Sequence, residues 1–417
     1  MNRPRVSFYT LGCRVNQYET RRIMENLPES ICIVPFGDDA EIAVINSCVV
    51  TSQAERETRK YISRAKNSVS KTVILTGCYV EIEQENSLDY EGILTVSGHK
   101  KDTIPNLIMD LLGVNGEPRG KGNVDSVARP PLLVQTGCDK KCAYCVIHIA
   151  RGPSKSFSYE DIKSEMLEFF RLGHQEVVLT GINIGSWGLE NKSGLNFTEL
   201  LKKLVRDIPD GFRIRIGSIE PEYVSDELIM LMEDKRIAAH LHTPFQSLSD
   251  EILIQMGRPN NVRQYEILAE KLNRKNIWFG GDLITGFPGE TELIHQKSMI
   301  ALKKINPSYL HVFPYSPRQG TVASEMEGYN ANTAKKRALE MRNIAGKLKE
   351  EHLVALLNQT LLVVCERSLP GGFYTGTSEF FNNVSFKSDS NPVSGKIYPV
   401  KITQVDGYVL RGYHVQK

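Results

Sequence analysis

Three cysteines within eight residues constrain this chain more than any other feature of its sequence. Cys138, Cys142 and Cys145 are separated by three and then by two residues. If the backbone loops around them, three thiolates can hold three corners of an iron-sulfur cube and leave the fourth iron without a protein ligand. Structural zinc normally takes four Cys or His ligands, usually as two pairs, and His148 is the nearest candidate for a fourth. The spacing therefore favours an iron-sulfur cluster with an open iron over zinc or a set of core thiols.

Length and composition describe an ordinary globular chain with room for two or three domains. The chain has 417 residues, of which 41% are hydrophobic and 24% charged, and its net charge of +2 gives no strong indication of a nucleic-acid partner. No apolar run is long enough to cross a bilayer, so we expect a cytoplasmic protein without a membrane partner. Eight cysteines in such a chain favour metal binding or catalysis over disulfides.

Strand-like runs in the first part of the chain are each followed by a cysteine. The runs cover residues 6–11, 42–46 and 72–76, and the cysteines are Cys13, Cys48 and Cys78. The carboxyl ends of parallel strands meet at one edge of a sheet, where ligands collect. We interpret the three thiols as ligands of a second iron-sulfur cluster, the alternative being three ordinary buried cysteines. Cys32 and Cys365 lack this context, and we expect them to be structural.

Composition divides the chain into an α/β domain, a linker, a second α/β domain and a β-rich tail. We place these parts at residues 1–112, 113–130, 131–350 and 351–417, respectively, because glycines and prolines concentrate in the second of them. Strands and helices alternate after the linker, which predicts a parallel (β/α) barrel or part of one. Its strand ends are polar and rich in glycine, as expected for a pocket, although any single residue there is more often a turn or cap residue.

The tail is predicted to be a small antiparallel β-barrel that follows a long helix at about residues 331–357. Residues 331–417 carry 12 Lys and Arg against 7 Asp and Glu. With Phe373, Tyr374, Phe380 and Phe381 available for stacking, this tail is a candidate platform for nucleic acid. The same aromatic residues would also serve as the core of a small barrel, so they alone do not decide between the two roles.

Taken in order, these features resemble the radical S-adenosylmethionine (SAM) methylthiotransferases over essentially the whole chain. That family has an amino-terminal domain with three separated cysteines, a radical SAM barrel and a carboxyl-terminal TRAM domain. The motifs that carry the resemblance lie at residues 10–20, 44–51, 75–79, 138–152, 178–183, 286–292 and 311–316. The opening Leu-Gly-Cys-Arg-Val-Asn-Gln-Tyr-Glu-Thr most resembles the MtaB-like branch, which acts on N6-threonylcarbamoyladenosine beside the tRNA anticodon.

The resemblance implies an enzyme that inserts a methylthio group at carbon 2 of N6-threonylcarbamoyladenosine at position 37 of tRNA, using two [4Fe-4S] clusters and two SAM molecules. It implies a catalytic radical SAM cluster on Cys138, Cys142 and Cys145, and an auxiliary cluster on Cys13, Cys48 and Cys78. The expected SAM contacts are Tyr144, Thr180, Gly181, Asn183, Ser218, Glu220, Gln246 and Asp282. The implied partners are the anticodon stem-loop of tRNA, an electron donor such as flavodoxin or ferredoxin, and a sulfur donor.

Departures from the family pattern leave the substrate open. His148 stands where these enzymes commonly have proline, and residues 247–250 and 256–260 also differ from the usual motifs. Methylthiolation of a ribosomal protein or peptide is therefore a second hypothesis. A non-catalytic iron-sulfur protein that binds RNA is a third, against which two complete cysteine triads argue.

Overall fold

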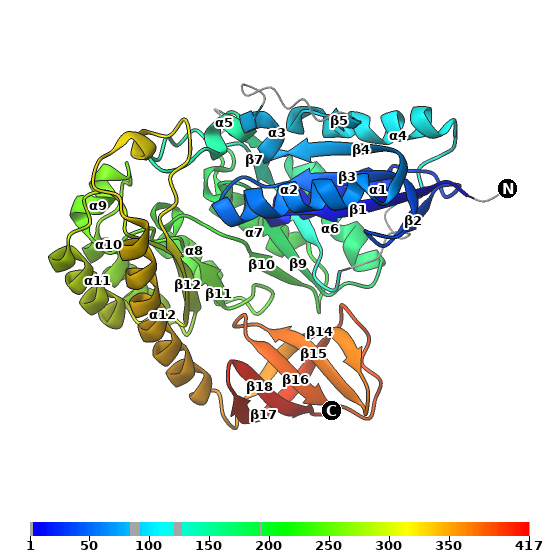
Figure 1. Cartoon of the computed structure of the whole chain (residues 1–417). Coiled ribbons are helices and arrows are strands. Elements are labelled where there is room, and N and C mark those ends of the chain that lie inside the picture. Colours follow the sequence, from blue (N-terminus) through cyan, green and yellow to red (C-terminus); the bar gives the residue numbers. More distant parts are fainter. Residues whose placement is uncertain (1–2, 84–91, 121–126, 192–193, 417) are drawn as a thin grey trace. The chain divides into compact units, whose positions relative to one another are not determined.

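The computed structural model describes residues 3–83, 92–120, 127–191 and 194–416. The chain forms two compact units, which we describe separately (Figure 1). The first unit comprises residues 1–126, 136–140 and 145–154, and the second comprises residues 127–135, 141–144 and 155–417. Within the three-cysteine motif, Cys138 and Cys145 belong to the first unit and Cys142 to the second.

The described part of the first unit is built on a parallel sheet with the strand order β2-β1-β3-β4-β5. Its strands are β1 (Arg5–Thr10), β2 (Cys32–Val34), β3 (Ala40–Ser47), β4 (Val69–Gly77) and β5 (Ile93–Thr95). Its helices are α1 (Arg14–Glu25), α2 (Ser52–Lys66), α3 (Cys78–Glu83), the 3-10 helix η2 (Gly98–Thr103), α4 (Ile104–Leu112) and α5 (Ile147–Arg151). The sheet has the parallel α/β architecture predicted for this region.

The second unit contains parallel strands in the order β6-β9-β10-β11-β12-β13, with single bridges linking β10 to the β11 segment. These strands are β6 (Pro131–Leu133), β9 (Glu176–Thr180), β10 (Arg213–Ile216), β11 (His240–His242), β12 (Trp278–Thr285) and β13 (Tyr309–Pro314). The helices between them are α6 (Tyr159–Arg171), α7 (Phe197–Asp207), α8 (Asp226–Leu231), α9 (Asp250–Gln255), α10 (Val262–Arg274) and α11 (Glu292–Ile305). The predicted partial (β/α) barrel is confirmed.

Short elements complete this part of the chain. They are β7 (Gln135–Thr136), β8 (Lys155–Ser156) and the 3-10 helices η4 (Ile184–Ser186), η5 (Pro221–Tyr223) and η6 (Val322–Glu325). Several of the helices begin at a side chain that caps the first backbone N–H groups, as Asn261 does in a capping box with Gln264 at the start of α10. The strands and the apolar faces of these helices form one continuous buried core.

The tail forms the predicted small barrel after the 24-residue helix α12 (Ala331–Val354). Its strands are β14 (Thr360–Leu369), β15 (Phe373–Ser378), β16 (Asn383–Lys387), β17 (Ile397–Asp406) and β18 (Val409–His414), closed in the order β14-β15-β16-β18-β17. Tyr374 and Phe380 are buried in its core, so they do not form part of a stacking surface. Phe373 is exposed, whereas Phe381 stacks on His240 of β11.

A buried ionic cluster joins the amino-terminal ends of β9 and β10 to the small barrel. The carboxylate of Glu176 is fully buried and accepts from Arg213 Nε at 2.5 Å and Arg215 Nε at 2.8 Å. Arg215 also donates to the carbonyl of Ser378 at 2.8 Å. Burial alone would raise the pKa of Glu176, but the adjacent Arg213, Arg215 and Arg129 lower it to about 2. The carboxylate of Glu176 is therefore the shared ion-pair partner of the buried Arg213 and Arg215, whereas Arg129 also pairs with Glu366 at 2.7 Å.

We predict that Glu176→Gln lowers the free energy of unfolding of the second unit by about 3–5 kcal/mol at pH 7, because it leaves buried arginines unpaired. The folded-state pKa lies below the ordinary 4.5, so this stabilisation is complete above pH 4.5 and is lost as the pH falls toward 2. The wild-type and variant proteins should therefore converge in acid. Both tryptophans, Trp187 and Trp278, belong to the second unit, so denaturant unfolding followed by tryptophan fluorescence measures it.

The matched control for this prediction is Glu227→Gln, which removes an exposed carboxylate paired with Lys202. It should change the unfolding free energy by about 1 kcal/mol or less, because exposed ion pairs contribute little. Equal losses in the two variants would contradict the role assigned to Glu176.

Candidate iron-sulfur and cofactor sites

Three cysteines of the first unit lie at the carboxyl edge of adjacent parallel strands. Cys48 and Cys78 directly follow β3 and β4, and Cys13 comes three residues after the end of β1. The register places the ends of these strands side by side, since Thr10 pairs with Asn46 and Asn46 with Thr76. This edge therefore gathers thiols that are 30 or more residues apart in the sequence.

The thiols are close enough to influence one another electrostatically. Burial, with smaller contributions from the nearby thiols of Cys78 and Cys13, raises the pKa of Cys48 to about 11. Within the described residues, no three His, Cys, Asp or Glu side chains are placed to share a single metal ion. The cysteines of an iron-sulfur cube each bind a different iron, so this donor set fits a cluster better than one ion.

Two glycines make the convergence of these cysteines sterically possible. Gly12 has φ +89°, and a β-carbon there would lie 2.7 Å from the sulfur of Cys48. Gly77 has φ +103°, and a β-carbon there would collide with the backbone of Ser47, 2.6 Å from its nitrogen. Both positions combine a left-handed backbone with close packing, which only glycine tolerates without strain.

A buried arginine provides a positive charge beside the three thiols. Arg151 ends α5, a helix whose Ala150 packs in the same core as the α3 residues Cys78 and Tyr79. Its Nε lies 3.3 Å from the sulfur of Cys78, and its other nitrogens contact Glu19 and Asn16. Although burial alone would lower the pKa of Arg151, Cys78 and Glu19 raise it, so the guanidinium remains charged. The sequence motif around Arg151 was noted, but this role was not predicted.

Glu19 also pairs with Lys101 at the same edge of the sheet. The amino group of Lys101 donates in addition to Asn46 Oδ1 at 3.0 Å. Burial opposes ionisation of Glu19, but Lys101 and Arg151 outweigh it and lower the pKa of this carboxyl. Burial lowers the pKa of Lys101 against the opposing effect of Glu19, whereas the pKa of Arg151 is raised. Arg151 therefore supplies positive charge near the cysteines. Such charge stabilises thiolates, which are the form of cysteine that binds metal.

The motif with three closely spaced cysteines is anchored within each unit. In the first unit, the backbone N–H of Cys138 donates to the carbonyl of Gly152 at 3.0 Å, and the N–H of Ile147 donates to the sulfur of Cys145 at 3.4 Å. In the second unit, the N–H of Ala143 donates to the carbonyl of Met256 at 3.0 Å. These contacts fix the backbone on both sides of the cysteines, and ligation by Cys138, Cys142 and Cys145 stays a prediction.

Most of the predicted SAM contacts lie at strand ends of the second unit, but they do not form one hydrogen-bonded group. Thr180 ends β9, and the N–H of the nearby Asn183 donates to Gln135 Oε1 at 2.8 Å. Gly181 lies so near Gln135 that a β-carbon there would be 2.7 Å from the Gln135 carbonyl oxygen. Tyr144 packs beside a separate apolar cluster. Their contact with SAM stays a prediction.

Glu220 shows how a predicted contact is held in place. Its carboxylate accepts from Arg258 Nη1 at 3.0 Å, and the side chain of Arg258 is only 1% exposed. Arg258 also donates to the carbonyl of Pro244 at 3.2 Å, which connects the segments after β10 and β11. The sequence drew attention to residues 256–260 only as a departure from the family pattern, so this positioning role was missed.

The remaining predicted contacts lie along β10, β11 and β12. Ser218 is exposed after β10 and bridges to His242, while the N–H of Gln246 donates to the carbonyl of Asp282 at 2.8 Å. Gln246 has φ +65°, an uncommon backbone conformation for a residue with a side chain. Asp282 lies within β12 and not at its end, and its side chain contacts His242 at 3.0 Å.

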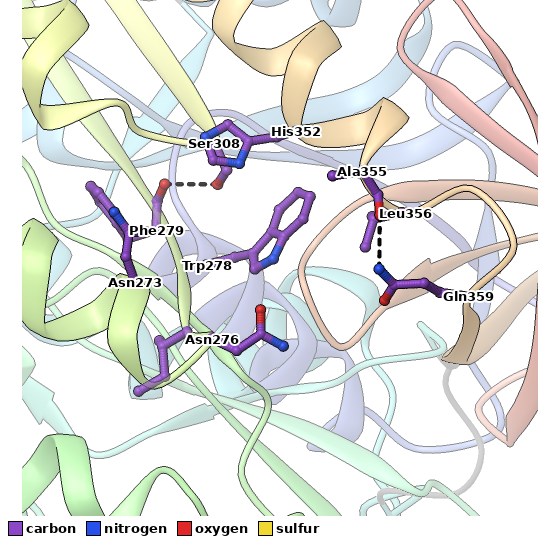
Figure 2. A pocket seen from close by; sticks show the side chains of 10 residues that line it. Asn273, Asn276, Trp278, Phe279, Ser308, His352, Ala355, Leu356 and Gln359 are labelled. Atoms are coloured by element: carbon purple, nitrogen blue, oxygen red, sulfur yellow. Dashed lines mark hydrogen bonds between the residues drawn. The ribbon is translucent and has the colours of Figure 1, made fainter.

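A cavity at the other end of β12 is separate from these residues. Figure 2 shows Trp278 at its centre, with His352 and Gln359 from the α12 side and Asn276 from the turn before the strand. None of the predicted site residues lines it. Since ligands of parallel α/β folds collect at the carboxyl ends of strands, we do not assign the cofactor to this cavity.

Comparison with known proteins agrees with the cysteine pattern and the fold. Residues 5–97 match the family described as "Uncharacterized protein family UPF0004", and residues 132–295 match the "Radical SAM superfamily". The "Threonylcarbamoyladenosine tRNA methylthiotransferase MtaB" of Thermotoga maritima is 31% identical over 392 residues, which cover 90% of each chain. The protein of the same name from Bacillus subtilis is 31% identical over 97% of this chain and 94% of its own. This chain belongs to the radical SAM methylthiotransferase family, in its MtaB-like branch.

The methylthiotransferase assignment makes the chain a transferase that uses SAM and an iron-sulfur cluster. Among solved structures, the radical SAM methyltransferase TsrM of Kitasatospora setae is similar in fold, with a TM-score of 0.56 and 15% identity over 78% of this chain and 77% of its own. At that identity the similarity concerns the fold alone. No described helix of the methylthiotransferase is both long and apolar enough to cross a membrane.

We predict that Gly77→Ala destabilises the carboxyl edge of the sheet far more than Gly113→Ala does. Both glycines have positive φ, so each substitution costs about 1–2 kcal/mol in backbone strain. Only at Gly77 would the new methyl group also collide with a neighbouring strand, whereas nothing lies within 4 Å at Gly113. Hydrogen-exchange mass spectrometry of peptides covering β4 and α3 should show faster exchange in Gly77→Ala alone. Similar exchange in both variants would exclude a steric role for Gly77.

Proposed function

We propose that this methylthiotransferase inserts a methylthio group at carbon 2 of N6-threonylcarbamoyladenosine at position 37 of tRNA. The observation that carries the proposal is the 31% identity to the Thermotoga maritima MtaB protein over 90% of both chains. The gathering of Cys13, Cys48 and Cys78 at one sheet edge supports it, because a family member without the chemistry would have no need of that arrangement. The implied substrate is the anticodon stem-loop of tRNA.

We assign one [4Fe-4S] cluster to Cys13, Cys48 and Cys78 and another to the motif Cys138–Cys145. When bound, the clusters and two SAM molecules supply radical chemistry for replacing an aromatic C–H hydrogen that side-chain acids and bases cannot activate. The protein's own groups supply ligation, position and charge. Arg151 and Lys101 place positive charge beside the auxiliary cysteines, and Arg258 holds Glu220 at the strand end.

Each domain of the chain has a part in the proposed reaction. Residues 1–112 hold the auxiliary site, 113–130 are the linker, 131–350 form the radical SAM domain and 351–417 the TRAM domain, whose basic residues suit RNA. An electron donor such as flavodoxin or ferredoxin and a sulfur donor complete the reaction. Because its substrate tRNA is made and used in the cytoplasm, we place the enzyme there.

Deletion of the gene should remove the methylthio derivative of N6-threonylcarbamoyladenosine from cellular tRNA. Mass spectrometry of digested tRNA should detect the derivative again after complementation with wild type, but not with Cys142→Ala, which lacks a ligand of the radical SAM cluster. The unmethylthiolated nucleoside should accumulate in its place. If tRNA is the same in all strains, the nucleoside is not the substrate, and methylthiolated protein or peptide becomes the alternative to test.

The iron content of the purified, reconstituted protein should report the two clusters separately. We expect about eight irons per chain in wild type and about four in either Cys48→Ala or Cys142→Ala, because each variant loses one [4Fe-4S] cluster. Cys365→Ala is the matched control, since this cysteine is buried in the core of the small barrel, belongs to neither triad and should leave the iron content unchanged. An equal iron content in all four proteins would overturn the assignment.

A further inference from the structure

One face of the strands β11, β12 and β13 carries polar side chains that the proposed chemistry does not use. These strands are parallel and in register, with His242 beside Gly280, Gly280 beside Tyr309, and Asp282 beside His311. Registered neighbours and residues two apart share a face of the sheet. The polar residues on this face are His240, His242, Asp282, Tyr309 and His311, which lie between Trp278 at one end of the strands and Ile284 and Phe313 at the other. The alternate residues Leu241, Phe279, Leu283 and Val312 are buried in the core that includes the helices.

Hydrogen bonds connect four of these side chains across the three strands. The hydroxyl of Tyr309 lies 2.9 Å from both His240 Nε2 and His242 Nδ1. The other nitrogen of His242 lies 3.0 Å from Asp282 Oδ2. A β-carbon at Gly280 would collide with the ring of Tyr309, so glycine in β12 is what allows this ring to reach across to β11. The arrangement is therefore built into the sequence of all three strands.

The Tyr–His–Asp network is covered at the amino-terminal end of the strands and exposed to solvent at the carboxyl-terminal end. Phe381 of the small barrel stacks on His240, with ring centroids 4.7 Å apart, and covers the amino-terminal side. Exposure then rises along the strands toward their carboxyl ends. The side chain of His240 is buried, those of His242 and Asp282 are 17% and 28% exposed, and His311 is exposed. The open part of the face is therefore accessible from the end of the strands where substrates of this fold bind.

We propose that Asp282 and His311 recognise the polar substituent on N6 of the substrate base, and that His242, whose two ring nitrogens contact Tyr309 and Asp282, holds Asp282 in position. This inference rests on the proposed function and names the part of the substrate that this face contacts. A threonylcarbamoyl group offers N–H, carbonyl and hydroxyl groups. The carboxylate of Asp282 accepts from an N–H or O–H, and the imidazole of His311 donates or accepts. The face thus recognises the carbamoyl and hydroxyl groups, because the negative charge of Asp282 disfavours the threonyl carboxylate. Asp282 thereby contacts substrate and not SAM.

The electrostatic surroundings agree with recognition by neutral hydrogen bonds. Although the residue as a whole is exposed, surrounding atoms partly desolvate its imidazole and lower the pKa of His311, and nearby His242 and Lys349 also lower it against the opposing effect of Asp282. The imidazole of His311 is therefore neutral at neutral pH and has one donor and one acceptor nitrogen. A base without the substituent leaves these groups without their partners, and sites built to hydrogen-bond a ligand group discriminate strongly against analogues that lack it.

Binding of two otherwise identical RNAs tests the proposal. The probes are an anticodon stem-loop with N6-threonylcarbamoyladenosine at position 37 and the same stem-loop with adenosine, each measured by fluorescence anisotropy with the full-length, cluster-reconstituted protein. We expect wild type to bind the modified RNA at least tenfold more tightly. His311→Leu should reduce this preference to threefold or less, whereas His311→Gln, which keeps hydrogen-bonding capacity, should retain an intermediate preference. Because His311 is exposed, neither substitution removes core packing.

The matched control is His352→Leu, which replaces a histidine of α12 that packs on Trp278 beside the cavity of Figure 2, at the opposite end of β12 from the open part of this face. It should keep the wild-type preference. A preference that survives His311→Leu, or a wild type without preference, would overturn the inference. Mass spectrometry of the same RNAs after reaction with SAM and reductant separates the two proposals. Methylthiolation without a binding preference refutes only the inference, whereas an unchanged RNA refutes the proposed function.

Discussion

The parallel register of β1, β3 and β4 is the constraint on which the auxiliary site depends. It places three thiols at one sheet edge, where their negative charges would repel each other if ionised together. The buried cations Arg151 and Lys101 offset that repulsion, and Glu19 holds both cations in place. In a poorly solvated site these interactions are much stronger than on the surface. The charged residues around the three thiols therefore matter to this site as well as the thiols themselves.

Arg151 lies close in sequence to the three-cysteine motif. Arg151 follows Cys145 by only six residues, and the segment 145–154 belongs to the first unit. The cation beside Cys78 is thus supplied by the same stretch of chain that carries Cys145 of the three-cysteine motif. A change in the backbone that displaces this stretch would alter both the motif and the charge near Cys78.

The sequence predicts those features that depend on local pattern. Strand-end cysteines, alternating strands and helices, and the small barrel follow from hydrophobic period and turn residues, and the structure has the corresponding folds. Arg151, Lys101 and Arg258 were missed because a charged residue looks the same in sequence whether it is solvated or buried against a partner dozens of residues away. Tyr374 and Phe380 show the same difficulty for aromatics, since only closure of the barrel decides which rings face inward.

The contacts of the two β11 histidines, His240 and His242, are the feature that the sequence predicts least. Alternating His240, Leu241 and His242 is a weak strand signal, and nothing local indicates that both imidazoles reach one tyrosine on β13. That contact requires a third strand between them with glycine at position 280. In many barrels, inward-facing side chains pack as an apolar core. Here the inward face changes from the ionic cluster of Glu176, through a Tyr–His network, to the open side chains of Asp282 and His311. Around Glu176 the polar groups are buried and ion-paired, whereas Asp282 and His311 are partly exposed at the end of the strands where a ligand can enter. The residues that stabilise this face are therefore different from those that can bind a ligand.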